Sequence, residues 1–291
     1  MFPFQGVGQK LVAELGLKAM NLTGYSAMNI GWNELSVGSD VLNGMISGIS
    51  FPLVTSNLVH KNSRLPLGKK YVISHVGDIR VGILGIMPVS PPASLCSTGG
   101  GGCGNHNAAG HDHSQEEISP ALLMENMEVI PPEDALQKLL PEVRKEADIV
   151  ILLSQYSFED TTSLVNQLEG IDLAVSGSRK RWARTNNKDS RGVPVMEVAY
   201  QTRKLGYLKV SLDDTGRVIQ DKQKMIRLGD TVASDVQIAQ ITGNDIHKKI
   251  QEEEKRKLEE EARALLKLSP YEYYQKLMKE QQDMQGSVPP K

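Results

Sequence analysis

The spacing of apolar residues predicts alternating helices and strands from residue 5 to about residue 220. Apolar side chains recur at helical spacing over 5–24 and stop at Gly24, which predicts a helix. Two further helices are predicted at 131–147 and 159–168. Short apolar runs predict strands at 25–30, 51–60, 71–76, 80–87, 148–154, 171–176, 193–198, 206–212 and 217–219. This alternation is typical of an α/β domain.

The pattern changes after about residue 230. Residues 244–268 are dense in Glu, Lys and Arg, which predicts a solvated helix with ion pairs between residues four apart. Its apolar stripe is thin and forms no sustained heptad, so we expect this helix to dock loosely or to project from the body. Pro270 ends it, residues 271–283 are expected to form a short second helix, and the tail at 284–291 is expected to be disordered.

We therefore divide the chain into an α/β domain at 1–230, interrupted by an insertion at 88–120, and a helical extension at 231–291. The 291 residues are 40% hydrophobic, enough to bury a sizeable core. Basic and acidic residues number 33 and 35, so net charge gives no reason to expect nucleic acid as a partner. No apolar run reaches the length that spans a membrane.

The insertion at 88–120 combines prolines, four consecutive glycines and most of the soft metal ligands of the chain. Thiolate and imidazole groups suit a single zinc, copper or nickel ion, although their spacing matches no common closed zinc motif. The alternative is a mobile polar insertion without a metal. The candidate ligands are Cys96, Cys103, His106, His111 and His113.

Six segments, in the correct order, resemble the calcineurin-like metallophosphoesterases of the 5′-nucleotidase branch. Residues 24–34 read G-Y-S-A-M-N-I-G-W-N-E, which resembles the family segment G-Y-D-A-M-x-x-G-N-H-E. The other segments are similar to family strands that read F-P-x-L-x-A-N, G-x-x-V-G-x-x-G, L-S-H and G-I-D-x-I-x-G-G, and to its closing strands; they lie at 51–57, 77–85, 148–157, 170–177 and 191–208. The resemblance implies a layered α/β metallophosphatase-like sandwich.

The resemblance also implies chemistry with two divalent metal ions that bind a phosphate and activate a water molecule. At the matching positions, Trp32 replaces a ligand Asn, Asn33 replaces the catalytic His and Gln155 replaces a ligand His. Ser178 and Lys180 stand for the final ligand pair, and Glu34 keeps the family residue. The D-x-H and G-D segments would precede residue 10, where neither occurs. We therefore expect the two metals not to bind in the usual way.

Each altered position admits a second interpretation. Trp32 and Asn33 are either a rebuilt binding site or a loop that packs a tryptophan, and Gln155 either binds a ligand or caps a buried strand. The basic run at 179–181, with Trp182 and Arg184, either holds an anion or is a solvated loop.

Three functions remain open. The first is a catalytically impaired or repurposed protein of this fold that binds a small phosphorylated ligand or a protein partner. The second is an active hydrolase of nucleotides or other phosphate esters, with the missing ligands supplied by an upstream segment. The third is a transition-metal or redox protein that uses the 96–113 loop.

We also expect the natural domain to begin upstream of Met1, and expect self-association if the strand at 25–30 lacks its neighbours. No signal peptide is visible, so the expected location is cytoplasmic if Met1 is the true start. The location is periplasmic or otherwise extracytoplasmic if an upstream signal is missing.

Overall fold

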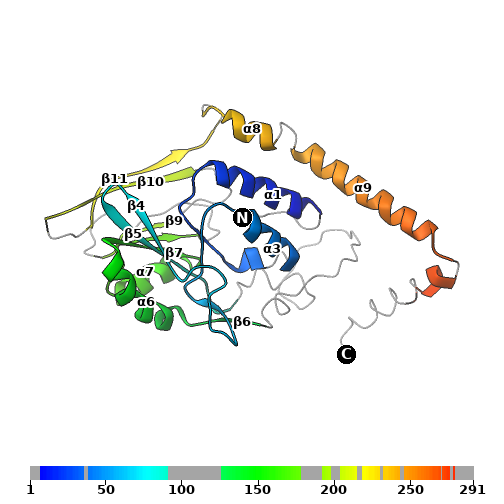
Figure 1. Cartoon of the computed structure of the whole chain (residues 1–291). Coiled ribbons are helices and arrows are strands. Elements are labelled where there is room, and N and C mark those ends of the chain that lie inside the picture. Colours follow the sequence, from blue (N-terminus) through cyan, green and yellow to red (C-terminus); the bar gives the residue numbers. More distant parts are fainter. Residues whose placement is uncertain are drawn as a thin grey trace, which may run out of the picture.

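The computed structural model describes residues 7–35, 39–90, 126–177, 192–197, 204–214, 218–229, 232–242, 246–269, 271–275 and 278. Within them the chain forms a five-stranded sheet with flanking helices, a second small core, a long β-hairpin and an extended C-terminal helix (Figure 1). The α/β fold expected from the sequence is confirmed. None of the helices in these ranges is long and apolar enough to cross a bilayer.

The central sheet has the strand order β4-β5-β7-β8-β9. Strands β4 and β5 form the expected antiparallel hairpin, and β5, β7, β8 and β9 run parallel to one another. Parallel strands end at the same edge of a sheet, so one edge collects four carboxyl ends. The strands are Val72–Val76, Ile79–Ile86, Ile149–Ser154, Leu173–Ser176 and Val195–Glu197.

Helices α6 (Pro132–Glu146) and α7 (Phe158–Gln167) cover one face of this sheet (Figure 1). Each helix buries one apolar stripe, and the stripes meet the strand residues in the main core, which includes Leu84, Leu136, Val143, Leu152 and Val165. Pro132 opens α6, where a missing N–H costs nothing, and Ser157 caps α7 by accepting from the Asp160 N–H.

A second core lies beside the first and was only partly predicted. It packs α2 (Trp32–Leu35) and α3 (Ser39–Gly48) against short strands, burying Ile30, Trp32, Leu35, Leu58 and Met127 among others. The short strands are β1 (Met28–Asn29) paired parallel with β2 (Leu53–Val54), and β3 (Leu58–His60) paired antiparallel with β6 (Met127–Val129).

Two expected strands are shorter than their apolar runs. The run at 51–60 is interrupted, because Ser56 and Asn57 bond through their side chains to the backbone of Gly85, Lys70, Met87 and Ile130. The strand expected at 25–30 contains only Met28–Asn29, and Tyr25 is exposed with its ring against Phe51. Full strands over 25–30 and 51–60 were therefore wrong predictions.

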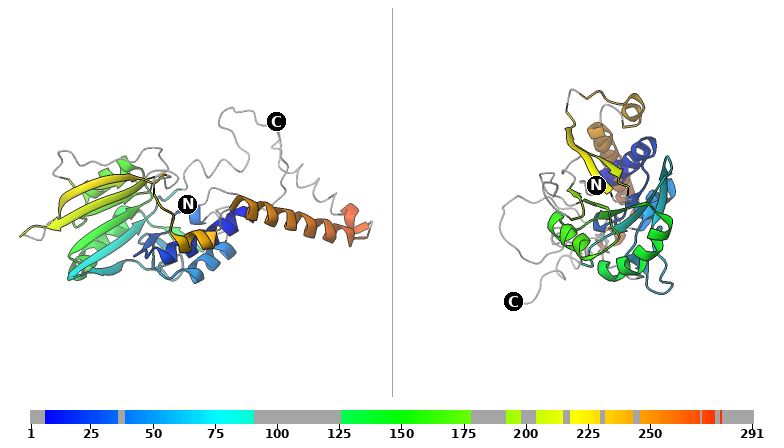
Figure 2. Two further views of the ribbon diagram at one scale, coloured as in Figure 1. Left: turned by 90° about the horizontal axis from the view of Figure 1, so that it is seen from above. Right: turned by 90° about the vertical axis from the view of Figure 1, so that its left-hand side faces the viewer.

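The remaining elements extend the molecule. Helix α1 (Val7–Leu22) contacts α3 and both C-terminal helices, α8 (Val236–Thr242) and α9 (Ile246–Leu266). Strands β10 (Lys204–Leu212) and β11 (Val218–Arg227) form a long antiparallel ribbon. Figure 2 shows that the ribbon and α9 reach in opposite directions from the body, so the expected projecting helix is confirmed.

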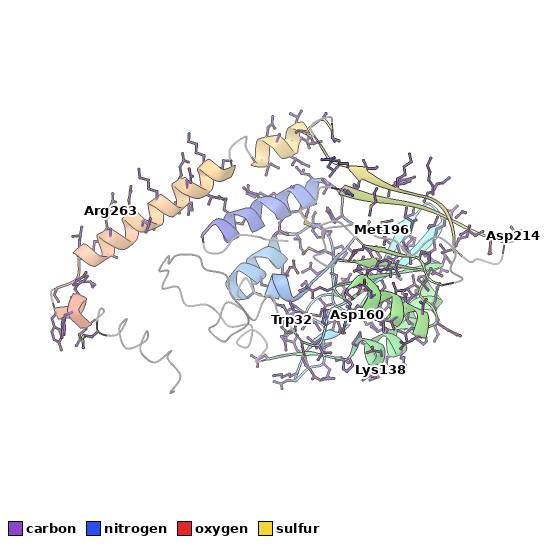
Figure 3. The ribbon with its side chains drawn as sticks, turned by 180° about the vertical axis from the view of Figure 1, so that it is seen from behind. Trp32, Lys138, Asp160, Met196, Asp214 and Arg263 are labelled. Atoms are coloured by element: carbon purple, nitrogen blue, oxygen red, sulfur yellow. The ribbon has the colours of Figure 1, made fainter. Side chains whose placement is uncertain are left out.

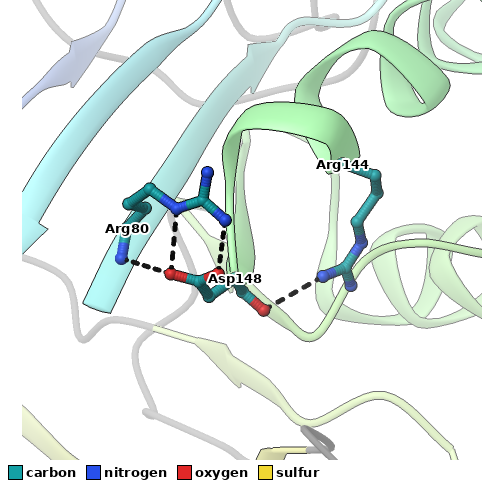
Figure 4. A network of polar contacts seen from close by, with 3 residues as sticks. All are labelled: Arg80, Arg144 and Asp148. Carbon is teal, nitrogen blue, oxygen red and sulfur yellow. Dashed lines mark hydrogen bonds and ion pairs between the residues drawn. The ribbon is translucent and has the colours of Figure 1, made fainter. Parts of the chain in front are cut away.

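A polar network ties the amino-terminal edge of the sheet together. Arg80 donates to both carboxylate oxygens of Asp148, and Arg144 donates to the Asp148 carbonyl (Figure 4). Arg144 also pairs with Asp172, 2.5 Å away, which joins α6 to the segment before β8. These contacts lie at the edge opposite the carboxyl ends of the parallel strands. They therefore do not occupy the edge where a ligand site is expected.

Candidate functional site

An open pocket of about 250 Å³ lies at the carboxyl ends of β7 and β8, beside the end of β1. Its wall combines amide, hydroxyl and carboxylate side chains with exposed backbone. The lining residues are Asn29, Gly31, Glu34, Leu153, Ser154, Gln155, Val175 and Gly177. Carboxyl ends of parallel strands are the usual place for ligands in α/β sheets, so we take this pocket as the candidate site.

Gln155, the first residue after β7, lies across the pocket onto the backbone of β1 and α2. Its Oε1 accepts a hydrogen bond from the Trp32 N–H at 3.1 Å. A Cβ atom built on Gly31 would lie 2.2 Å from Gln155 Nε2, so only glycine leaves room for this amide. Gln155 thus bonds to backbone, as in the interpretation of a polar cap, and also lines the pocket, as in the interpretation of a ligand-binding residue.

Trp32 is 3% exposed and belongs to the second core. Its indole Nε1 donates to the Pro88 carbonyl at 2.7 Å, two residues after the end of β5. The next residue, Val89, donates its N–H to the Tyr156 hydroxyl. This bond favours the phenolate, but burial has the larger effect and raises the pKa of Tyr156 above its ordinary value. The backbone at Pro88–Val89 is therefore held from two sides before the insertion begins.

Glu34 caps its own helix. Its Oε2 accepts from the Gly31 N–H at 3.0 Å, while the Glu34 N–H donates to the Gly31 carbonyl at 3.1 Å. The Glu34 carboxylate thus supplies one half of a capping box, the bond back to the Gly31 N–H, while the bond from the Glu34 N–H is an ordinary backbone turn bond because glycine has no side chain to accept it. Glu34 is 7% exposed and lies between the polar pocket and a small apolar cavity lined by residues such as Leu17 and Ile46.

Two asparagines join the strand ends around the pocket. Asn29 donates from Nδ2 to the carbonyls of Ile86 and Leu153, the end of β5 and the penultimate residue of β7. Its Oδ1 is buried without a hydrogen-bond partner among the described residues. A Cβ atom built on Gly85 would lie 2.6 Å from the same oxygen, so the Asn29 side chain packs directly against the glycine backbone.

Asn57 makes a second, fully buried bridge. Its side chain donates to the carbonyls of Met87 and Ile130 and accepts from the Met87 N–H. The sequence indicated Asn57 only as part of a strand, and Asn29 was not singled out. The available signal in both cases was an amide residue inside an otherwise apolar run.

The described residues at this edge do not fit a pair of metal ions. The acceptor oxygen of Gln155 is bonded to Trp32, the Glu34 carboxylate is bonded to Gly31, and Asn29 Oδ1 is enclosed against Gly85. Within the same ranges, no group of three or more His, Cys, Asp or Glu side chains converges to hold a metal.

Several predicted site residues fall outside the described part of the chain. They are Ser178 and Lys180, with the basic run that follows Gly177, and the candidate metal ligands Cys96, Cys103, His106, His111 and His113. The backbone of Asn33 lies in α2, next to the capped turn. The structure therefore brings together Trp32, Glu34 and Gln155 from the predicted set.

No family model matches the chain. Its sequence is similar to 5′-nucleotidases, for example that of Rattus norvegicus, which is 26% identical over 245 residues. A snake venom 5′-nucleotidase of Gloydius brevicauda is 23% identical over 242 residues. Each match covers 75% of this chain, whereas the chain spans only 38% and 37% of these relatives.

Solved structures show the same fold. The calcineurin-like phosphoesterase YfkN from Bacillus subtilis matches with a TM-score of 0.58 and 19% identity, covering 83% of this chain and 74% of that one. A 5′-nucleotidase precursor from Thermus thermophilus matches with a TM-score of 0.53 and 20% identity, covering 74% of this chain and 41% of that one. The chain therefore has the calcineurin-like metallophosphoesterase fold and is related in sequence to the 5′-nucleotidase branch.

Proposed function

We propose that this chain is a 5′-nucleotidase-like domain that binds a small phosphorylated ligand without hydrolysing it. The observation that carries the proposal is the hydrogen bond between Gln155 and the Trp32 backbone, which closes the end of β7 onto the start of α2. A side chain used in this way supports the local fold, and only one lone pair of its neutral amide oxygen remains for a ligand.

The proposed loss of hydrolysis follows from the chemistry of the reaction. Phosphoester cleavage by a two-metal site needs several carboxylate or imidazole ligands that hold the ions a few ångströms apart. Here the resemblance aligns two such positions with Trp32 and Gln155. An indole offers no lone pair to a metal, and the one neutral amide oxygen is already bonded to a backbone N–H.

Ligand binding is supported by the pocket that remains. Its polar wall includes Gln155, Ser154 and Gly177. The apolar residues Leu153 and Val175 lie beside them. A few fixed polar groups on an apolar wall are typical of small-molecule sites. The size and polarity suit a nucleotide or sugar phosphate whose hydroxyl groups would bond to the amide.

The first test is turnover. The purified chain is assayed with a 5′-nucleotide and an aryl phosphate in the presence of Mg²⁺, Mn²⁺, Co²⁺ or Zn²⁺, and we expect no turnover above the metal-only blank. Gln155→Ala is measured in parallel, with Gln167→Ala as a control because Gln167 is an exposed α7 residue bonded to Ser163. Metal-stimulated turnover that Gln155→Ala abolishes and Gln167→Ala keeps would overturn the proposal in favour of an active hydrolase.

The second test is binding. Trp32 contacts the pocket segment, and the chain has two tryptophans, so a Trp182→Phe variant isolates its fluorescence. We expect titration with a nucleoside monophosphate to change this signal with saturation, and expect Gln155→Ala to weaken binding at least tenfold. Unchanged fluorescence, together with no heat on calorimetric titration at millimolar ligand, would contradict ligand binding.

A further inference from the structure

Helix α9 is the most extended part of the described chain. Only its first turns contact the body, where Ile250 is buried and the helix touches α1. The rest runs outward, and Arg263 lies far from every labelled residue of the body (Figure 3). The outer two-thirds of α9, from Glu253 to Leu266, is called the arm below.

The arm is stabilised by its own charges. Lys255 pairs with Glu259, and Arg256 pairs with both Glu253 and Glu260, all within the helix. These side chains are largely exposed, so each pair contributes little, but several pairs at spacings of three and four residues support the helix where it runs outward from the other described elements. The arm is therefore a preformed surface.

The arm also exposes large apolar side chains. Leu258 is 65% exposed and Leu266 is 85% exposed, and Ala262, one turn from each, is exposed as well. Leu258 and Ala262 lie on one side of the helix, because residues four apart are neighbours on its surface. This narrow apolar strip is too small to bind a flat surface tightly, but it matches the width of another helix.

The charges are arranged antisymmetrically about Leu258. Counting outward from Leu258, residues at equal distances carry opposite charges at 257 and 259, 256 and 260, 255 and 261, and 253 and 263. The remaining pair in this span, Glu254 and Ala262, adds no ion pair. In an antiparallel helix pair centred on Leu258, a residue n positions before it lies level with the residue n positions after it in the other copy.

We propose that the arm binds the arm of a second copy of this chain, antiparallel, with the two Leu258 side chains at the two-fold axis. Each basic run at 255–257 then lies level with the acidic run at 259–261 of the partner, and Glu253 lies level with the partner's Arg263. A parallel pair would instead place like charges level at every position. Among the level pairs, 255 and 261 lie nearest the Leu258 side of the helix, so the charge pattern favours the antiparallel orientation of two copies.

The proposed contact is small. An arm of 14 residues, counted from Glu253 to Leu266, is about 20 Å long. A helix pair of this length falls at the low end of specific interfaces, below about 1,200 Å² of total buried area. We therefore expect a dimer that forms at micromolar or higher concentration and weakens as salt screens the charges.

Charge reversal tests the pairing on the full chain by sedimentation velocity. In one variant residues 255–257 become Glu, and in the other residues 259–261 become Lys, so each variant carries one sign of charge at both runs, 255–257 and 259–261. We expect each variant alone to dimerise at least tenfold more weakly than the natural chain, and expect an equimolar mixture to recover heterodimers. Circular dichroism of the mixture and of each variant checks that α9 still forms.

A mixture that stays monomeric while both variants are helical would overturn the proposal, as would a natural chain that stays monomeric at several hundred micromolar. If a variant loses helix, cross-linking decides instead. In a Cys96→Ser, Cys103→Ser background, Leu258→Cys should form a disulfide-linked dimer on mild oxidation. Ala262→Cys should not, because antiparallel pairing separates the two residues by about 12 Å along the axis, beyond the reach of a disulfide.

Efficient cross-linking at Ala262 with none at Leu258 would show a different antiparallel register, and efficient cross-linking at both positions would show a parallel pair; either result would reject the proposed arrangement. Because these measurements do not involve the pocket, their outcome is independent of the ligand proposed for it.

Discussion

Gln155 Oε1 accepts a hydrogen bond from the Trp32 N–H at 3.1 Å, although the two residues lie 123 positions apart in the chain. This one contact joins the end of β7 in the main sheet to the first residue of α2 in the second core. The two cores also meet through Asn29, which bonds to β5 and β7 from strand β1, and through Ser56, which accepts from the Gly85 N–H of β5. The candidate pocket is therefore also the seam between two packed units.

Removing the Gln155 amide should loosen this seam. Gln155→Ala leaves the partly buried Trp32 N–H without its acceptor, which costs about 1–2 kcal/mol of unfolding free energy. Urea denaturation measures the loss, with Gln167→Ala as the matched exposed control that should change stability by less than about 0.5 kcal/mol. Equal midpoints for the two variants would show that the seam bond contributes nothing.

Gly85→Ala should be strongly destabilising. The added methyl group would lie 2.6 Å from Asn29 Oδ1 and 2.7 Å from the Val54 carbonyl oxygen, and the second of these is backbone that cannot rotate away. Overpacking of this kind costs about 1–3 kcal/mol. The control is Gly44→Ala in α3, where a Cβ meets nothing within 4 Å and helix propensity predicts a gain of about 0.5–1 kcal/mol. Thermal unfolding of both variants separates steric conflict from the general effect of replacing glycine.

The Arg80–Asp148 pair predicts a specific acid sensitivity. Hydrogen bonds from the Arg80 side chain and backbone lower the pKa of Asp148 to about 2. A lowered pKa means that the folded state favours the carboxylate, so this stabilisation is present above the ordinary aspartate pKa and is lost as pH falls toward 2.

Asp148→Asn should therefore be less stable than the natural chain at pH 7, and the difference should shrink between pH 4 and pH 2. Urea midpoints at a series of pH values test this expectation. A difference that stays constant down to pH 2.5 would show that the loss comes from packing and not from the charge.

The 96–113 segment remains a sequence-based hypothesis. If it binds one transition-metal ion, a Cys103→Ser, His111→Ala double variant should lose bound metal after reconstitution under reducing conditions. Elemental analysis measures the content, and His75→Ala on the exposed strand β4 serves as the control. Equal metal in all three proteins would exclude the segment as a site.

Hydrogen exchange should distinguish the arm from the sheet. At low micromolar concentration the amides of residues 253–266 should exchange much faster than those of β7, which is hydrogen-bonded on both sides in the sheet and largely buried. Raising the protein concentration should slow exchange in the arm but not in β7. Concentration-independent exchange in the arm would speak against self-pairing.

The sequence predicted the elements whose apolar pattern repeats over many residues and the strands that are almost completely buried. Strand β5 is buried along most of its length, and α6 shows a clear helical stripe, so both were located within two residues. Helices α3 and α8 were missed because they are short and because the glycine or polar residues between their apolar positions resemble loop sequence. Strand β6, three residues long, gives too short a pattern for any period.

The site was predictable only where a residue type was unusual for its position. Trp32 and Gln155 were identified by comparison with a motif, but their mutual hydrogen bond depends on how β1 and β7 are placed by the fold. Asn29 and Asn57 act by bonding to strand-end carbonyls, and nothing in a single sequence shows which carbonyls will lack a partner. Tertiary geometry, and not local pattern, determines these contacts.

The close approach of Gln155 to Gly31 has a consequence for how such chains can change during evolution. A side chain at position 31 and a long side chain at position 155 exclude each other, because both would occupy the same space. A side chain at position 31 is therefore tolerated only where the residue at 155 has shortened or turned away, whereas position 155 can shorten while glycine remains at 31. Homologous chains should show covariation between these two columns, with glycine at 31 wherever 155 is Gln in this rotamer.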